Sequence, residues 1–240
     1  MKIMKLESSR GFTLTESVIA IGVVAVLLTT FLAVFGPATQ GISRAIGAED
    51  ANRLVAALET ELSVLREGES DDHTTAFDKA FNWIGSSGNI ADGQGIFLFN
   101  YKGDPTQIGE DGRMLPTANS ESSNPDTDYV LTPMVSNDLN ASADFLGAVS
   151  GPVFLVKTYQ LVYNNGGGLE IAGTNGQGIN PPKQGQESLS GTGSDAYPEA
   201  VIAFRADFYR LRSNSQAYLN DLDASDLERP IFERNLAVRR

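Results

Sequence analysis

The sequence predicts an α+β protein in which a long N-terminal helix packs on a C-terminal antiparallel sheet. Three features of the chain predict this class. Residues 17–43 contain no charged side chain, and an apolar stripe with helical spacing follows them. Beyond residue 66, short runs rich in β-branched and aromatic residues take over, which is typical of strands. Tracts rich in Gly, Asn, Ser, Asp and Pro separate these runs and indicate turns.

We expect residues 12–66 to form one helix in two parts. The eighteen residues 18–35 would rise about 27 Å as a helix, close to the hydrocarbon thickness of a bilayer. Residues 12–36 are therefore predicted to be a transmembrane helix. Pro37 follows Gly36 and has no N–H to donate, so a kink or local unwinding is expected there.

The second part of the predicted helix, residues 37–66, is amphipathic. Its apolar stripe follows the spacing i, i+4, i+8, i+11 and consists of Leu54, Leu58, Leu62 and Leu65, with Val55 beside them. The charged residues are expected on the other faces: Glu49, Asp50, Arg53, Glu59, Glu61 and Arg66. The stripe predicts that this part of the helix docks on the protein's own sheet.

Residues 67–240 are predicted to be a soluble, β-rich globular domain. Strands are expected at residues 95–101, 128–134, 152–163, 200–211 and 229–240. Long loops are expected at residues 102–127 and 164–198, where turn-forming residues accumulate. Loops of this length are usually functional or mobile, and an ordered glycine-rich hairpin insertion on the sheet is the alternative.

A short basic leader precedes the apolar segment, and one carboxylate stands where that segment begins. A carboxylate in this position indicates a functional site, because burying an ionised group in hydrocarbon costs several kcal/mol. The motif Gly11-Phe12-Thr-Leu-Thr-Glu16 closely resembles the cleavage and methylation signal of type IV prepilins and type II secretion pseudopilins. The resemblance covers the leader and the N-terminal helix, up to about residue 50.

The resemblance implies a role for each residue of the motif. Prepilin peptidase would cleave after Gly11, removing residues 1–11 as a leader, and would N-methylate Phe12. Glu16, the fifth residue after the cut, would pair with the N-terminal amine of a neighbouring subunit during assembly. Pairing an amine with a carboxylate relieves the penalty that each would carry alone in an apolar medium.

Two other interpretations of the N-terminus compete with the prepilin signal. A secretory signal would explain the basic residues Lys2, Lys5 and Arg10, but the apolar stretch is longer than the usual 7–15 residues and no clean Ala-x-Ala site follows. A plain single-pass anchor would explain the length of the stretch. It would not explain Glu16, nor the Gly-Phe pair before it.

Charge and composition exclude several classes of function. The formal net charge is −12, and removal of the leader, which carries +2, leaves about −14 on the mature chain. Such an acidic surface repels phosphate backbones, so no nucleic-acid partner is expected. The chain has no cysteine and one histidine, His73, in a polar stretch that predicts a loop. Phosphate-binding, zinc-protease and nucleophile-elbow motifs are missing from the sequence, so no enzymatic activity is expected.

One acidic cluster is a candidate cation site. Within eight residues lie the four carboxylates of Asp221, Asp223, Asp226 and Glu228. Calcium requires several oxygen ligands, and some pseudopilins bind it in a C-terminal loop. The spacing lacks the glycine and the register of an EF-hand, and a solvated acidic turn or a helix cap is the simpler interpretation. No other cofactor is expected.

The family resemblance predicts a structural subunit, a minor pilin or pseudopilin. Its partners would be prepilin peptidase and other pilin or pseudopilin subunits, contacted through the N-terminal helix. Before assembly it would cross the inner membrane once, with the C-terminal domain outside the cytoplasm, and afterwards belong to a periplasmic or extracellular filament. The alternative is an exported, membrane-anchored binding or adhesion domain that recognises a ligand through residues 164–198. Secretion, motility, adhesion and uptake all remain open.

Overall fold

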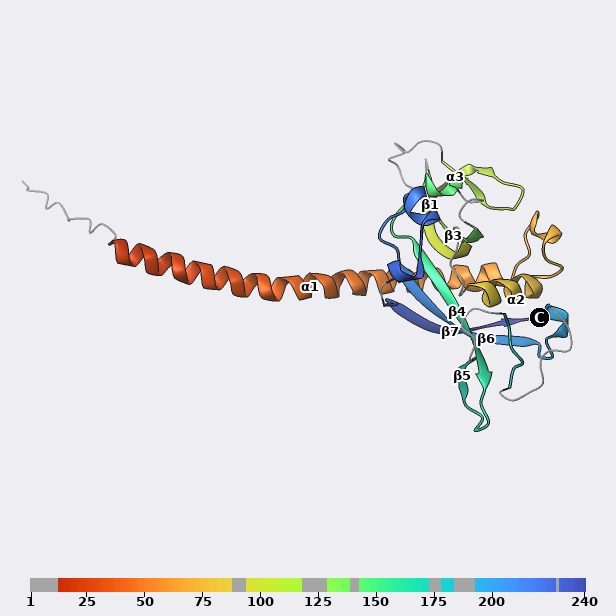
Figure 1. Ribbon diagram of the computed structural model, residues 1–240. Helices are drawn as coiled ribbons and strands as arrows, with labels where there is room; N and C mark the ends of the chain where they lie inside the picture. The colour runs from red at the N-terminus through yellow and green to blue at the C-terminus, as the bar shows by residue number, and fades with distance from the viewer. Residues whose placement is uncertain are drawn as a thin grey trace, which may run out of the picture. The chain divides into compact units, whose positions relative to one another are not determined.

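The protein is α+β, with an apolar N-terminal helix followed by a C-terminal antiparallel sheet (Figure 1). The computed structural model describes residues 13–87, 94–117, 129–138, 143–172, 178–183, 193–227 and 229–240. The chain divides into two compact units, Met1–Ile46 and Gly47–Arg240. The predicted class is therefore confirmed.

The elements have the following bounds. The helices are α1 Leu14–Leu62, η1 Glu69–Asp71, α2 Ala76–Ser86, α3 Ala143–Leu146, η2 Ser194–Ala196, α4 Gln216–Asn220 and η3 Ala224–Asp226. The strands are β1 Gln94–Ile108, β2 Met114–Pro116, β3 Val130–Asp138, β4 Phe154–Tyr163, β5 Leu169–Ile171, β6 Val201–Arg210 and β7 Phe232–Arg239.

The long helix α1 differs from the prediction at two places. It continues through Gly36 and Pro37, so of the two expected alternatives the local unwinding does not occur, and a kink stays a prediction. It also ends at Leu62 rather than near residue 66. The next two amides donate hydrogen bonds to carbonyls only three residues earlier, Ser63 N to Thr60 O and Val64 N to Glu61 O. These tighter turns end the helix.

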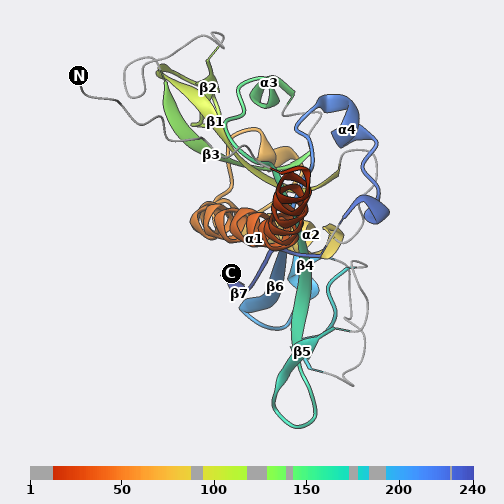
Figure 2. The ribbon, with the colours of Figure 1, turned by 90° about the vertical axis from the view of Figure 1, so that its left-hand side faces the viewer.

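The sheet is antiparallel and has the order β2-β1-β4-β6-β7, with β3 paired to β1 and β5 paired to β4. The strands β4, β6 and β7 run side by side in both ribbon views (Figures 1 and 2). Along this part of the sheet, residues 154–160 of β4 pair with residues 204–210 of β6. All eight residues of β7 pair with β6.

One face of the sheet packs against the end of α1 and against α2. The four stripe residues that lie within α1 are all buried there: Leu54, Val55, Leu58 and Leu62. The sheet contributes alternate residues of β6, namely Ile202, Phe204, Ala206 and Phe208. Helix α2 adds Phe77, Ala80, Phe81, Trp83 and Ile84. The predicted docking of the amphipathic helix on the sheet is thus confirmed for these four residues. Leu65, which lies beyond the helix end, is only partly buried.

The opposite face of the sheet carries a second, smaller core. The alternate β1 residues Phe97, Phe99 and Tyr101 are fully buried in it. Leu146 of α3 and Leu219 of α4 cover them. The sheet is therefore covered on both faces near β1 and β4, which explains why β1 has a long run of buried residues instead of a strict alternation.

Both predicted loops are wrong in part. Within 102–127, β1 continues to Ile108 and turns back into β2, because hydrogen-bonded pairing with β2 and β3 compensates for the turn-forming residues. Within 164–198, β5 forms a hairpin with β4, in line with the alternative of an ordered insertion, and η2 follows. Residues 118–128, 173–177 and 184–192 lie outside the described residues. The first unit of the chain consists mainly of the start of α1. The surface of this part of the helix is the candidate functional site.

Candidate functional site

The first turn of α1 forms a reciprocal cap between Thr13 and Glu16. Thr13 Oγ1 accepts a hydrogen bond from Glu16 N at 3.2 Å, and Glu16 Oε2 accepts from both Thr13 N and Thr13 Oγ1 at 3.2 Å. This is a capping box, in which the side chains at N-cap and N3 satisfy each other's amides. Glu16 therefore has a partner within the chain, which corrects the interpretation of it as an unpaired carboxylate. Gly11 and Phe12 lie outside the described residues.

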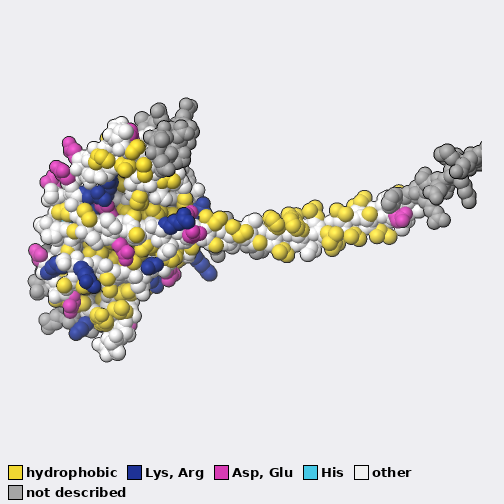
Figure 3. Space-filling model, turned by 180° about the vertical axis from the view of Figure 1, so that it is seen from behind, with side chains coloured by type: hydrophobic (Ala, Val, Ile, Leu, Met, Phe, Trp, Pro, Cys, Tyr) yellow, Lys and Arg dark blue, Asp and Glu magenta, His cyan; other side chains and the backbone are white. Residues whose placement is uncertain are grey.

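The surface of α1 after this cap is apolar on every side. The stretch Leu14–Phe35 has a mean hydropathy of 2.8 with none of its residues buried, and its 22 residues would span about 33 Å. By length and composition it can cross a membrane. Hydrophobic side chains lie all along the visible side of the helix in the space-filling view (Figure 3). A helix that is apolar all round needs lipid or other apolar helices to cover it.

The two threonines in the middle of this stretch hydrogen-bond within the helix. Thr29 Oγ1 donates to the carbonyl of Ala25 and Thr30 Oγ1 to that of Val26, each at 2.8 Å. The rings of Phe31 and Phe35 stack with their centroids 4.7 Å apart. In hydrocarbon, hydroxyl groups have no water to bond, so donation to a carbonyl one turn back removes their desolvation penalty.

At its other end, α1 enters a buried cluster of charges around Glu61. The Glu61 carboxylate, only 3% exposed, lies 2.7 Å from Lys79 Nζ of α2. It also lies 2.8 Å from Arg66 Nη2 and 2.8 Å from Arg113 Nη2, which belongs to the turn between β1 and β2. One carboxylate thus ties the helix end to three separate segments of the second unit.

Two further carboxylates balance the cations of this cluster. Glu69 Oε2 lies 2.8 Å from Lys79 Nζ, and Asp111 Oδ2 lies 3.1 Å from Arg113 Nη1. Lys79 is completely buried, and its third partner is the carbonyl of Val64 at 3.0 Å. The three protons of the ammonium group are therefore all used, the condition under which a buried lysine is tolerated.

The cluster lowers the pKa of Glu61. Burial alone would raise it, but the hydrogen bond from Arg66 and the charges of Arg113 and Lys79 outweigh burial. The prediction that Glu61 lies on a polar face of the helix is wrong. Glu61 lies three residues after Leu58 and seven after Leu54, so helical spacing puts it on the apolar stripe itself.

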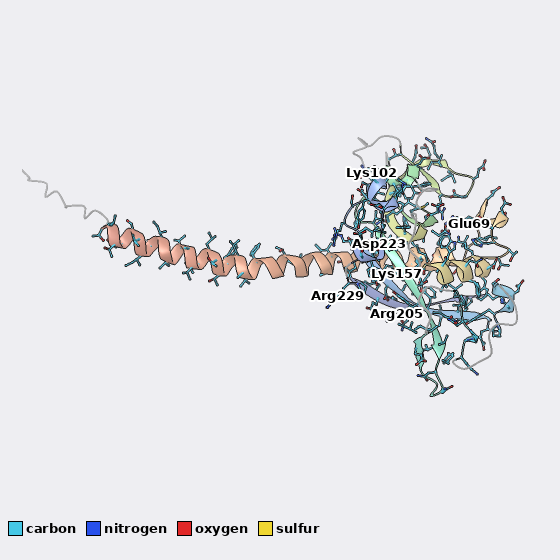
Figure 4. All side chains as sticks on the ribbon, in the orientation of Figure 1. Glu69, Lys102, Lys157, Arg205, Asp223 and Arg229 are labelled. Atoms are coloured by element: carbon cyan, nitrogen blue, oxygen red, sulfur yellow. The ribbon has the colours of Figure 1, made fainter. Side chains whose placement is uncertain are left out.

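A second group of charges lies on the sheet face opposite α1. Arg205 and Lys157, both labelled in Figure 4, flank Asp207, and Arg205 Nε lies 2.8 Å from Asp207 Oδ1. Burial raises the pKa of Asp207 despite the hydrogen bond and charge of Arg205, and burial lowers the pKa of Lys157. The cations also lie over aromatic rings, Arg205 over Tyr159 and Lys157 over Tyr209. These contacts satisfy the charges locally.

The predicted calcium ligands are only partly described. Asp221 follows α4, and the carboxylates of Asp223 and Asp226 accept backbone amides of their own turn, from Ser225 at 2.8 Å and from Asp223 at 3.1 Å. Glu228 lies outside the described residues. Among the residues with assigned positions, no group of three or more acidic, histidine or cysteine side chains is placed to hold a metal. Calcium binding stays a prediction.

His73 lies between η1 and α2, in the predicted loop. Its Nδ1 is 3.4 Å from Nδ2 of the Asn82 amide.

No family model, curated protein or solved structure matches the chain. A function must therefore be inferred from the N-terminal motif and from the geometry of α1.

Proposed function

We propose that the chain is a pilin-like structural subunit, a minor pilin or pseudopilin of a type IV pilus or type II secretion filament. The observation that carries this proposal is the division of α1 into two surfaces. From Leu14 to Phe35 every residue is exposed and most are apolar, whereas Leu54, Leu58 and Leu62 of the same helix are buried in the second unit. The first surface is left for lipid and then for neighbouring helices.

The proposed route has a membrane stage and a filament stage. In the inner membrane, Leu14–Phe35 spans the bilayer and the second unit lies outside the cytoplasm. Prepilin peptidase removes residues 1–11 and methylates Phe12. In the filament, Glu16 receives the N-terminal amine of a neighbour. Its Oε1 accepts no hydrogen bond from the part of the chain that the structure describes, which supports a second partner there.

Processing tests the proposal directly. Protein from the native host should begin with N-methyl-Phe12, as measured by intact mass and N-terminal sequencing. Gly11→Leu should leave an uncut precursor in the membrane, because the peptidase needs a small residue at the cut. The matched control is Gly22→Leu, at a helical position with open space around it, which should be cut normally. A mature chain that starts downstream of Phe35 would contradict the proposal and indicate a secretory signal.

Assembly tests the role of Glu16. Glu16→Ala should insert into the membrane normally, since it removes a costly polar group, yet enter sheared filaments poorly. Glu59→Ala removes an exposed carboxylate further along α1 and should assemble as the unchanged chain does. Normal filament incorporation of Glu16→Ala would rule out the pairing role.

A further inference from the structure

A cavity of about 400 Å³ lies between the end of α2, the start of β1 and residues 178–179. Small-molecule sites have volumes of about 300–1,000 Å³. Gly178 N donates to the carbonyl of Gly85 at 3.0 Å, which holds the segment against α2. A Cβ atom at Gly85 would come within 3.2 Å of Gly178 Cα, so two glycines form this wall at close approach.

The cavity has an apolar floor and a polar rim. The floor consists of the buried residues Phe81, Trp83 and Ile96. The rim consists of the exposed residues Asn82, Ser86 and Asn137. Within the described part of the chain, the indole N–H of Trp83 has no hydrogen-bond acceptor. A buried donor without a partner is uncommon in proteins, but this nitrogen is itself buried from solvent, so it is not counted among the groups that a ligand in the cavity reaches.

The electrostatics of the cavity disfavour an ionic ligand. None of its described lining residues is charged. The last turn of α2, Ser86 included, forms one side, and the C-terminal end of a helix carries partial negative charge that repels anions. A cation would find no carboxylate among the described lining residues to neutralise it. The described lining residues therefore favour a neutral molecule.

The rim selects the chemistry of that molecule. The Asn137 amide offers two N–H donors and a carbonyl acceptor at a fixed separation. Asn82 keeps its carbonyl and one N–H, because its Nδ2 also contacts His73 Nδ1 at 3.4 Å, and Ser86 Oγ, which donates to the Trp83 carbonyl at 3.5 Å, offers an acceptor. Neighbouring hydroxyl groups on a ring present the matching alternation of acceptors and donors. The apolar floor matches the C–H face of such a ring.

We propose that this cavity binds a neutral, hydroxyl-rich ligand, a mono- or disaccharide, with Asn82 and Asn137 recognising its hydroxyl groups. The site gives the chain a carbohydrate-binding function in addition to the structural role proposed above. It does not depend on that role, since the cavity belongs entirely to the second unit.

The single tryptophan of the chain makes the test specific. Trp83 is the only tryptophan, so intrinsic tryptophan fluorescence comes from a residue that lines this cavity. The full chain, held in a zwitterionic detergent without a sugar headgroup, is titrated with glucose, N-acetylglucosamine and maltose. A ligand of about a dozen non-hydrogen atoms reaches an affinity on the order of 1 mM, so at least one sugar should give a saturable change in that range.

Two rim variants and a control complete the experiment. Asn137→Ala should weaken binding about fivefold to tenfold, the effect of one lost hydrogen bond. Ser86→Leu, on the exposed side of α2, should block the rim and serves if the first variant folds poorly. Asn235→Ala, at an exposed position of β7 outside the cavity, should bind as the unchanged chain does.

Either of two results would overturn the inference. One is an unchanged fluorescence signal with all three sugars up to about 50 mM, a concentration far above the dissociation constant expected for ligands of this size. The other is an equal response from the unchanged chain and from both rim variants. Neither result would affect the processing and assembly tests above, so failure of the sugar site and failure of the structural role are distinguishable.

Discussion

Replacing Glu61 by leucine should lower the free energy of unfolding by about 3 kcal/mol, because removing one partner of a buried ion pair costs about 3–5 kcal/mol. In this protein the carboxylate serves Lys79 at 2.7 Å and Arg66 and Arg113 at 2.8 Å each. We expect the lower end of the range. Lys79 keeps Glu69 as a partner after the change, and the new leucine side chain joins the apolar stripe.

Urea denaturation and thermal unfolding of the full chain measure this loss. For a folded unit of this size, a change of about 3 kcal/mol corresponds to a fall of about 6–12 °C in Tm. Glu59→Leu is the matched control, since it makes the same change two residues earlier at an exposed position and should stay within about 0.5 kcal/mol.

A second change tests whether the charges act together. Adding Lys79→Met to Glu61→Leu should recover part of the stability, because an apolar pair replaces the unpaired ammonium group. Equal effects of Glu61→Leu and Glu59→Leu, or strictly additive effects of the Glu61 and Lys79 changes, would refute the reasoning.

Three further predictions follow from the same structure. The folded-state pKa of Glu61 lies below its ordinary 4.5, so the stabilisation by this carboxylate is fully present above pH 4.5 and is lost as the pH falls through the folded pKa. Urea midpoints measured against pH should show this loss, and Glu61→Leu should reduce the fall of the midpoint at acidic pH. Gly47→Leu should destabilise the fold by about 1–3 kcal/mol, measured by urea denaturation, because a Cβ there lies 3.2 Å from Ile231 Cδ1. A chain beginning at residue 43 should melt cooperatively by circular dichroism, whereas one beginning at residue 67 lacks the buried stripe and should aggregate.

The apolar stripe of α1 was predictable because burial follows the helical period. Leu54, Leu58 and Leu62 are all buried, as their spacing requires. Glu61 occupies the same face, yet its charge led to the opposite interpretation. Two of the cations that permit its burial lie 18 and 52 residues away in sequence, so only the tertiary structure brings them together.

Two features were present in the sequence and were missed. Phe77, Ala80, Phe81 and Ile84 follow the spacing i, i+3, i+4, i+7 of an amphipathic helix, and Thr75 caps it by accepting a hydrogen bond from Asp78 N at 3.1 Å. The Thr-x-x-Glu pattern of the capping box at the start of α1 was likewise readable. The β1–β2 ribbon was not predicted, because its Gly, Asp and Pro residues favour turns over strands, although its paired residues, Gly103 with Pro116 and Ile108 with Met114, are close in sequence.

The charge cluster also determines how α1 would respond to mechanical load. A pull along the helix axis reaches the second unit at Gly47, and the last attachment of α1 is its final turn, where Glu61 holds Arg66, Lys79 and Arg113 at once. These contacts come from three different segments, so withdrawal of Glu61 breaks all three. The helix end therefore acts as a clamp, and its strength under force is set by the rate at which all three contacts open.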